Sequence, residues 1–301
     1  MRESLPSLFK LNKNPSVLSK TKDLKYAWTM ATIKSKTTLP HSELTPDSTS
    51  PGVRDFAAEA PIALTYNGVS HVVMMVSPAD LEEFVTGFSL SEEIVSTPSE
   101  ITSLKISEAE VGLIARIEIP QDRFEALIQR GRNLVGQTGC GLCGVAELKD
   151  AVRSYPPIRH KPKAGKKALF RALSQLEGRQ PLNRATGAVH GAAFVDAKGN
   201  LRALYEDVGR HNAFDKLIGY MARENIDVTK GFVLLTSHCS FELVQKALSI
   251  GVPMLVTVSA PTALAIKLAR DHRLTLVALA RPDSMLAVND PFDLFARART
   301  H

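Results

Sequence analysis

The stretch Gly231-Phe-Val-Leu-Leu-Thr236 decides the fold, because it is a short apolar run that ends in a polar turn. Two similar runs follow it, at Val252–Val258 and Leu274–Ala280, and segments with helical periodicity over 240–250 and 261–270 separate the three. Short apolar strands that alternate with helices are typical of βαβ units, in which a parallel sheet is buried on both faces. The sequence therefore predicts an α/β fold for this part of the chain.

A hairpin and a long helix are predicted upstream of this unit. Two strands over 192–196 and 201–205 flank the turn Lys198-Gly199-Asn200, and a helix is predicted over 211–223. Ligands of open α/β sheets bind beyond the carboxyl ends of the strands. Polar segments stand at those ends here: Thr236–Ser240, Ser259–Thr262 and Arg281–Ser284. We therefore expect a binding site at this edge, where helix N-termini attract phosphate.

The first half of the chain shows the pattern of a smaller α+β portion. The dipeptide Asn67-Gly68 favours a tight hairpin turn, because both positions of that turn need positive φ. Strands are predicted at 62–66, 71–76, 101–106 and 112–119, and helices at 79–94 and 122–132. We predict that this portion spans 56–150 and ends in a glycine-rich loop with two cysteines.

Composition excludes several classes of protein. Hydrophobic residues make up 44% of the 301-residue chain, which is enough for a packed core. No apolar run is long enough to span a bilayer, and no secretory signal is visible at the N-terminus. Three cysteines are too few for a disulfide-stapled secreted fold, so we expect a cytoplasmic protein that does not act at a membrane.

The positive charge is confined to one end of the chain. Residues 1–36 hold eight cationic and two acidic side chains, which account for the whole net charge of +6. The neutral remainder gives no support for nucleic-acid binding, so none is expected. Residues 1–55 are predicted to be a disordered or variable leader, and 151–168 a basic, proline-rich linker that precedes an α/β portion over 169–301.

Cys140 and Cys143 lie three positions apart in a glycine-rich segment. Two thiols at this spacing can share a metal, form a disulfide, or lower each other's pKa so that one becomes a thiolate. Zinc needs two further ligands, which Cys239 and the histidines could supply, but no second Cys-x-x-C or His-x₃-His is present. The residues before Cys140 do not form a buried strand, as a thioredoxin-like motif requires. A loop that carries a nucleophilic thiolate fits better, and no metal is expected.

A dense polar run, Glu206-Asp-Val-Gly-Arg-His-Asn-Ala-Phe-Asp-Lys216, occupies a strand-to-helix turn. Asp207 could cap the helix, Arg210 and Lys216 could hold phosphate, and His211 could move a proton. A capping network with solvated charges would explain about half of these residues. His190 and His238 are further candidates, since each stands near the end of a strand or helix, although a structural role is the alternative for both.

These residues together resemble the FdhD family, the sulfurtransferases needed to make active formate dehydrogenase. The resemblance covers roughly 60–285, and the run Glu206–Lys216 is its most specific part. Four other stretches carry it: Cys140–Gly144, Thr186–His190, Ser240–Gln245 and Val258–Thr262. The family commonly has Gly-Arg where this chain has Asp283-Ser284, and an arginine where His238 stands. Two positive charges that are common in the family are therefore absent from this chain.

The resemblance implies a fold similar to cytidine deaminases, with a mixed sheet between helical layers. It also implies a task in which a cysteine desulfurase supplies persulfide sulfur to Cys140, supported by Cys143. The sulfur then passes to the molybdenum of a bis-guanine-dinucleotide cofactor destined for formate dehydrogenase. The residues assigned to cofactor binding are Leu279, Ala280, Arg281, Pro282, Asp283, Ser284, His190, Asp207, Arg210, His211, Ser237, His238 and Ser259.

Two alternatives belong to other classes, and the oligomeric state stays open. A zinc deaminase needs His-x-Glu and Pro-Cys-x-x-Cys, but His190 is followed by Gly-Ala and no proline precedes Cys140. A non-catalytic carrier or chaperone for the cofactor would bind it and dock on formate dehydrogenase without moving sulfur. A homodimer is compatible with this fold.

Overall fold

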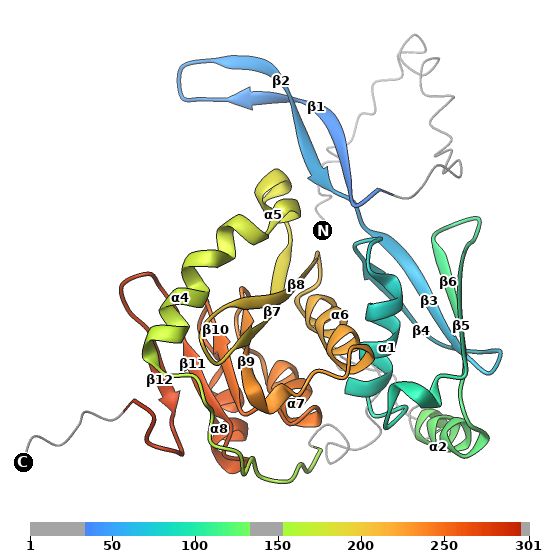
Figure 1. Cartoon of the computed structure of the whole chain (residues 1–301). Helices are drawn as coiled ribbons and strands as arrows, with labels where there is room; N and C mark the ends of the chain where they lie inside the picture. Colours follow the sequence, from blue (N-terminus) through green and yellow to red (C-terminus); the bar gives the residue numbers. More distant parts are fainter. Residues whose placement is uncertain (1–33, 133–152, 296–301) are drawn as a thin grey trace, which may run out of the picture. The chain divides into compact units, whose positions relative to one another are not determined.

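A mixed sheet of six strands forms the centre of the second half (Figure 1). The computed structural model describes residues 34–132 and 153–295, all of which belong to one unit. The strand order is β12-β11-β10-β9-β7-β8. The strands are β7 (His190–Asp196), β8 (Leu201–Asp207), β9 (Gly231–Leu235), β10 (Met254–Thr257), β11 (Thr275–Ala278) and β12 (Leu286–Asn289).

The three predicted apolar strands are parallel and buried. β10 pairs with β9 on one side and β11 on the other, and every residue of the three strands is buried. Successive side chains point to opposite faces, where they join two separate cores. One face is covered by α6 (Arg210–Arg223), α7 (Phe241–Ser249) and α8 (Ala263–Asp271), and the other by α4 (Lys166–Leu176). The prediction of a mixed sheet between helical layers is confirmed.

Antiparallel strands complete the sheet on both sides. β7 and β8 form the predicted hairpin, and Gly199 in its turn has φ +85°, a value that favours glycine. β7 runs antiparallel to β9, so β7 begins at the edge where β9 ends. β12 pairs antiparallel with β11 and was not predicted, since Leu286–Asn289 is short and half exposed.

The N-terminal portion is a four-stranded sheet with two helices. Its strand order is β4-β3-β6-β5, with β3 and β6 parallel and the other pairs antiparallel. Asn67 and Gly68 both have positive φ, as the hairpin turn requires. The strands are β3 (Ala60–Tyr66), β4 (Val69–Val76), β5 (Ser103–Glu108) and β6 (Leu113–Glu118), and the helices are α1 (Leu81–Ser91) and α2 (Gln121–Arg132). The predicted α+β portion is therefore present.

Helices α1 and α6 pack closely and join the two portions (Figure 1). A Cβ atom at Gly87 would collide with the backbone carbonyl of Asp215, and one at Gly219 would collide with that of Glu83. The absence of side chains at these two positions lets the helix backbones approach each other. The helix pair thereby fixes α6, whose first residues lie at the predicted binding edge.

Regular structure begins earlier than the sequence predicted. β1 (Lys36–Leu44) and β2 (Thr49–Ala57) pair antiparallel in a ribbon of their own, so the predicted leader over 1–55 does not hold for these residues. Most side chains of the ribbon are exposed, which removed the apolar alternation that reveals a strand. Arg54 ties the ribbon to α5 (Pro181–Thr186) through a 3.1 Å hydrogen bond to the Thr186 carbonyl oxygen.

The remaining described segments are short. Residues 153–165 contain no helix or strand. Three 3₁₀ turns span Pro98–Glu100, Glu177–Arg179 and Val228–Lys230. Within the ranges that the structure describes, no helix has both the length and the apolar character needed to cross a lipid bilayer.

Candidate functional site

One edge of the six-stranded sheet gathers most of the predicted site residues. Since β7 is antiparallel to β8 and β9, the start of β7 meets the ends of both neighbours. His190 opens β7, Arg210 begins α6 just after β8, and His238 lies between β9 and α7. The predicted residues from three separate stretches therefore come to one place.

Arg210 is the centre of this cluster. Its Nε atom is buried without a hydrogen-bond partner, and among the described residues its guanidinium forms no ion pair. A buried donor without a partner costs about 1–3 kcal/mol, a cost that a bound anion would offset. The N-terminus of α6, a helix of 14 residues, adds its free N–H groups at the same place. The arrangement fits an anionic group.

The two histidines beside Arg210 are held neutral. Burial lowers the pKa of His190, and the charge of Arg210 lowers it further. Burial, Arg210 and Lys246 lower the pKa of His211 to about 4. The Nε2 atom of His211 lies 3.4 Å from Ser240 Oγ and 4.0 Å from the carboxylate of Glu242. At neutral pH these imidazoles can donate or accept hydrogen bonds without adding charge, so Arg210 supplies the fixed charge.

A cavity of about 500 Å³ lies farther along the same edge, beyond the ends of β10 and β11. Val258, Ala280, Arg281 and Pro282 line one side, and the α4–α5 connection supplies the other. The side chain of Arg281 donates to the carbonyl oxygens of Val258 and Ala280, the latter at 3.1 Å. These bonds hold a cation at the mouth of the cavity.

Gln180 is a residue of this cavity that the sequence did not reveal. It is 6% exposed, and its Nε2 atom has no hydrogen-bond partner. A Cβ atom at Gly191 would lie 2.8 Å from that nitrogen, so the glycine makes room for the amide. No motif marks a glutamine at the start of a short helix, and only the packing identifies it. Gln180 lines the cavity and also lies beside Gly191, the residue after His190.

The segment Leu279–Ser284 is divided between two cavities. Ala280, Arg281 and Pro282 face the first, while Asp283 and Ser284 line a second one of about 380 Å³ with Lys166. A 2.8 Å bond from Arg281 N to the Ser284 carbonyl closes a turn between them. Ser259 lies beside this segment, because its carbonyl accepts a 3.4 Å bond from Leu279 N.

Asp207 and Lys216 serve the packing of the fold, which corrects their assignment to ligand binding. Their side chains are both 0% exposed, and Lys216 Nζ lies 2.7 Å from Asp207 Oδ2. Asp207 also accepts bonds from the backbone N–H of Ser77 and Gly209 and from Asn212 Nδ2. Asp207 is not the cap of α6, since Gly209 occupies that position. With these partners, neither charge is open to a ligand.

Ser237 and Cys239 are also poor candidates for a site. Ser237 is buried, and its hydroxyl donates to the carbonyl oxygen of His238, the next residue. Cys239 is 0% exposed, and burial raises the pKa of its thiol to about 12. It is therefore neither a nucleophile nor a zinc ligand. In the described parts of the chain, no three His, Cys, Asp or Glu side chains come close enough together to hold a metal.

Cys140 and Cys143 lie outside the described residues, but the chain on either side of them is fixed. Arg130, near the end of α2, donates to the carbonyl oxygens of Glu92 and Glu93. Arg153 donates to the Ser91 carbonyl at 3.0 Å and to the Glu92 carboxylate at 2.7 Å. We call residues 133–152 the cysteine segment. The chain just before it and the chain just after it are both bound to the C-terminal end of α1.

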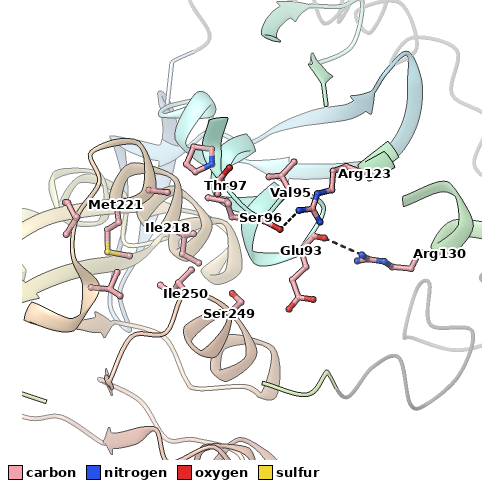
Figure 2. A pocket seen from close by; sticks show the side chains of 15 residues that line it. Glu93, Val95, Ser96, Thr97, Arg123, Arg130, Ile218, Met221, Ser249 and Ile250 are labelled. Carbon is pink, nitrogen blue, oxygen red and sulfur yellow. Dashed lines mark hydrogen bonds between the residues drawn. The ribbon is translucent and has the colours of Figure 1, made fainter. Parts of the chain in front are cut away.

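A further cavity of about 660 Å³ lies near these flanks (Figure 2). Figure 2 shows Arg123 and Arg130 on one side of it and Ile218, Met221 and Ile250 on the other. None of the residues predicted to bind the cofactor lines this cavity. Its size alone gives no reason to prefer it, because no described side chain with a buried unpartnered polar atom lines it, whereas Arg210 and Gln180 at the sheet edge each have one.

Comparison with known proteins gives one consistent result. A family model described as the FdhD/NarQ family matches residues 57–294. Sulfur carrier protein FdhD of Xanthomonas campestris pv. campestris (strain B100) is 46% identical over 235 residues, covering 78% of this chain and 84% of that protein. The protein of the same name from Cupriavidus necator is 44% identical over 237 residues, covering 79% and 82%.

A solved structure shares the fold. It is described as a formate dehydrogenase accessory protein from Desulfotalea psychrophila, and the match has a TM-score of 0.67 at 24% identity. The match covers 85% of this chain and 97% of that one.

Proposed function

We infer that this chain, which belongs to the FdhD/NarQ family, carries sulfur as a persulfide on Cys140 and delivers it to a molybdenum cofactor of formate dehydrogenase. The match over 57–294 carries this proposal, because it includes both the cysteine pair and the run Glu206–Lys216. The relatives at 46% and 44% identity are named sulfur carriers, which supports the same role here.

The first step is a thiol–persulfide exchange. The thiolate of Cys140 attacks the outer sulfur of a persulfide on a cysteine desulfurase. A new S–S bond forms on Cys140, the S–S bond of the donor breaks, and the donor leaves as a thiolate. Glycines on both sides of Cys140 leave room for a bulky partner to approach.

Release of the sulfur needs two electrons, and Cys143 is placed in the sequence to supply them. Attack of the Cys143 thiolate on the inner sulfur of the Cys140 persulfide forms a Cys140–Cys143 disulfide and frees the outer sulfur as sulfide. Both electrons come from the oxidation of the two thiols, so no external reductant is required in this step. The molybdenum of the cargo then takes up the sulfide.

The sheet edge fits a cargo that carries phosphates and a heteroaromatic base. Arg210 has an unpartnered donor, and Arg281 presents a second cation beside the cavity. The buried amide of Gln180 lacks a partner on its nitrogen, and a base with hydrogen-bonding edges would supply one. These groups fit the guanine dinucleotide arms of the cargo better than a small apolar ligand. His190, His211, His238 and Ser259 lie along the same edge.

The test is mass spectrometry after incubation with a cysteine desulfurase and cysteine. We expect one added sulfur atom on the peptide that holds Cys140 and Cys143. Cys140→Ala should lose the adduct and fail to support active formate dehydrogenase, whereas Cys239→Ser should keep both as a matched control. Active enzyme with Cys140→Ala would mean that the chain only carries the cofactor, which would overturn the sulfur transfer.

A further inference from the structure

Three helices meet at one buried group of charges that the proposed function leaves unused. Lys246 of α7 lies 2.9 Å from Asp215 Oδ1 of α6, and 3.1 Å from Oε1 of Glu92, the residue that ends α1. Lys246 also donates to Ser91 Oγ at 2.8 Å. Burial opposes the charge on Lys246, but the carboxylates of Asp215 and Glu92 outweigh it and raise its pKa.

Glu92 is the outermost member of this group. Its Oε1 faces Lys246 and its Oε2 accepts a 2.7 Å bond from Arg153. Burial would raise the pKa of Glu92, but Lys246 and Arg153 lower it to about 2, so its charge persists across the physiological range. The carboxylate of Glu92 therefore bridges the buried Lys246 and Arg153, which follows the cysteine segment.

The opposite flank of the segment is held by the same helix end. Arg130 donates to the carbonyl oxygens of Glu92 and Glu93, the second bond being drawn in Figure 2. These carbonyls lie at the C-terminus of α1, where the helix dipole favours cations. Glu93 has φ +55°, so the chain turns there and presents its carbonyl to Arg130.

The charge group also extends along α6 toward the sheet edge. Asp215, the partner of Lys246, follows His211 by four residues in α6, so the two side chains lie on the same side of that helix. Arg153 and the start of α6 are therefore connected through Glu92, Lys246 and Asp215, which belong to the packed helices α1, α7 and α6.

We propose that Glu92 is a positioning residue for sulfur delivery: its carboxylate, fixed by Lys246, clamps Arg153 and so holds the C-terminal flank of the cysteine segment against the body of the protein. The effect on sulfur delivery rests on the proposed function. The contact between Glu92 and Arg153 does not, since it can be measured without sulfur. Arg153 follows Cys143 by ten residues, so a fixed Arg153 sets an upper limit on the distance between the thiols and a cargo bound on the same body, which favours transfer. Loading from an external desulfurase depends less on this geometry.

The clamp is tested by limited proteolysis of the full-length chain with trypsin, followed by mass spectrometry at the bond after Arg153, because that side chain must leave Glu92 before it can enter the protease. Glu92→Gln should accelerate this cleavage about tenfold, because local opening no longer breaks an ion pair. Glu93→Gln is the matched control, since among the described residues its carboxylate has no hydrogen bond or ion pair. Arg153→Lys keeps a cation opposite Glu92 and should retain most of the protection seen in the parent chain. Equal cleavage rates for Glu92→Gln and Glu93→Gln would overturn the clamp.

The positioning role is tested by separating loading from delivery. With Glu92→Gln we expect persulfide on Cys140 at the rate of the parent chain, but about tenfold slower activation of formate dehydrogenase. Arg153→Lys should recover the delivery rate, and thermal melting of each variant checks the fold. Equal delivery by the parent and Glu92→Gln would refute the role. If the parent never loads sulfur, the proposed function fails, while the cleavage result still decides the clamp.

Discussion

Two cations in the same eleven-residue run, Glu206–Lys216, behave in opposite ways. Lys216 is fully buried and pairs with Asp207, whereas Arg210, six positions earlier, has an unpartnered Nε at the sheet edge. Both follow from the strand-to-helix turn, which points Lys216 into the interior against the carbonyl oxygens of Ser77 and Glu206 and leaves Arg210 at the sheet edge. One polar run thus contributes both to the packing of the fold and to the candidate site. Only the ion-pair and hydrogen-bond partners of each residue distinguish the two roles.

Lys216 and Arg210 also differ in how they affect the free energy of folding. A buried ion pair is weak support for stability as a whole, but removing one of its members leaves an uncompensated charge. An unpartnered cation at an edge costs stability and contributes to binding instead. Substitutions in the two regions should therefore separate cleanly into effects on folding and effects on binding.

Removing the buried partner should have the largest effect. Lys216→Met leaves the Asp207 carboxylate without its cation at 0% exposure, so we expect about 3–5 kcal/mol less stability in urea denaturation. The double variant Asp207→Asn with Lys216→Met removes both charges and should recover part of that loss. A loss below about 1 kcal/mol for Lys216→Met would show that the pair is not buried as described.

The close contact of α1 and α6 can be broken without touching a charge. Gly219→Ala places a Cβ against the backbone carbonyl of Glu83, and we expect a loss of about 1–3 kcal/mol or more as the helices separate. Gly178→Ala is the control, because nothing lies within 4 Å of a Cβ there. Thermal unfolding of both variants compares them directly, and equal stability would contradict the close packing.

Arg210 should show the reverse behaviour. Arg210→Met should raise stability, by up to about 1–3 kcal/mol, since it removes a buried donor that has no described partner. It should weaken binding of guanosine diphosphate at least about tenfold in calorimetry, because one charge-assisted hydrogen bond is lost. Arg202→Met is the control, since Arg202 is 59% exposed and pairs with Asp196 at the other end of the hairpin. Unchanged affinity for Arg210→Met would place the anion elsewhere.

Substitution of His211 should give the smallest effect, a change in how the free energy of unfolding depends on pH. Its pKa is lowered from 6.5 to about 4, so the unfolded chain binds the proton more readily between these values. This part of the stability is complete above pH 6.5 and is lost as the pH falls toward 4. Because the ring is 30% exposed, we expect a loss of only about 1–2 kcal/mol. His211→Gln should flatten the pH dependence of urea denaturation, and an unchanged slope would contradict it.

Much of the fold could be predicted, because the strongest patterns came from burial on both faces of a sheet. The apolar runs of β9, β10 and β11 and the turn at Asn67-Gly68 each reflect one local physical cause. β1, β2 and β12 were not predicted, because strands with exposed side chains lack an apolar pattern. Their pairing depends on backbone hydrogen bonds, which the side-chain sequence does not display.

The structure brings most of the predicted site residues together, but the sequence did not show which of them are buried. Arg210, His190, His211 and His238 meet at one edge because the strand order places the start of the antiparallel β7 beside the ends of β8 and β9. The rule for parallel strands predicted only the ends of β9, β10 and β11. Asp207 and Ser237 were misassigned, since a sequence shows residue type but not burial. Gln180, Glu92 and Lys246 carry no motif and depend on contacts between distant segments.

The account as a whole is tested most directly by following one labelled sulfur atom. The chain is loaded from isotopically labelled cysteine and a desulfurase, separated from the donor, and mixed with unsulfurated cofactor and inactive formate dehydrogenase. We predict that the label leaves the Cys140 peptide and appears in the cofactor in step with the gain of enzyme activity. Activation of the enzyme while the label stays on the chain would contradict sulfur delivery.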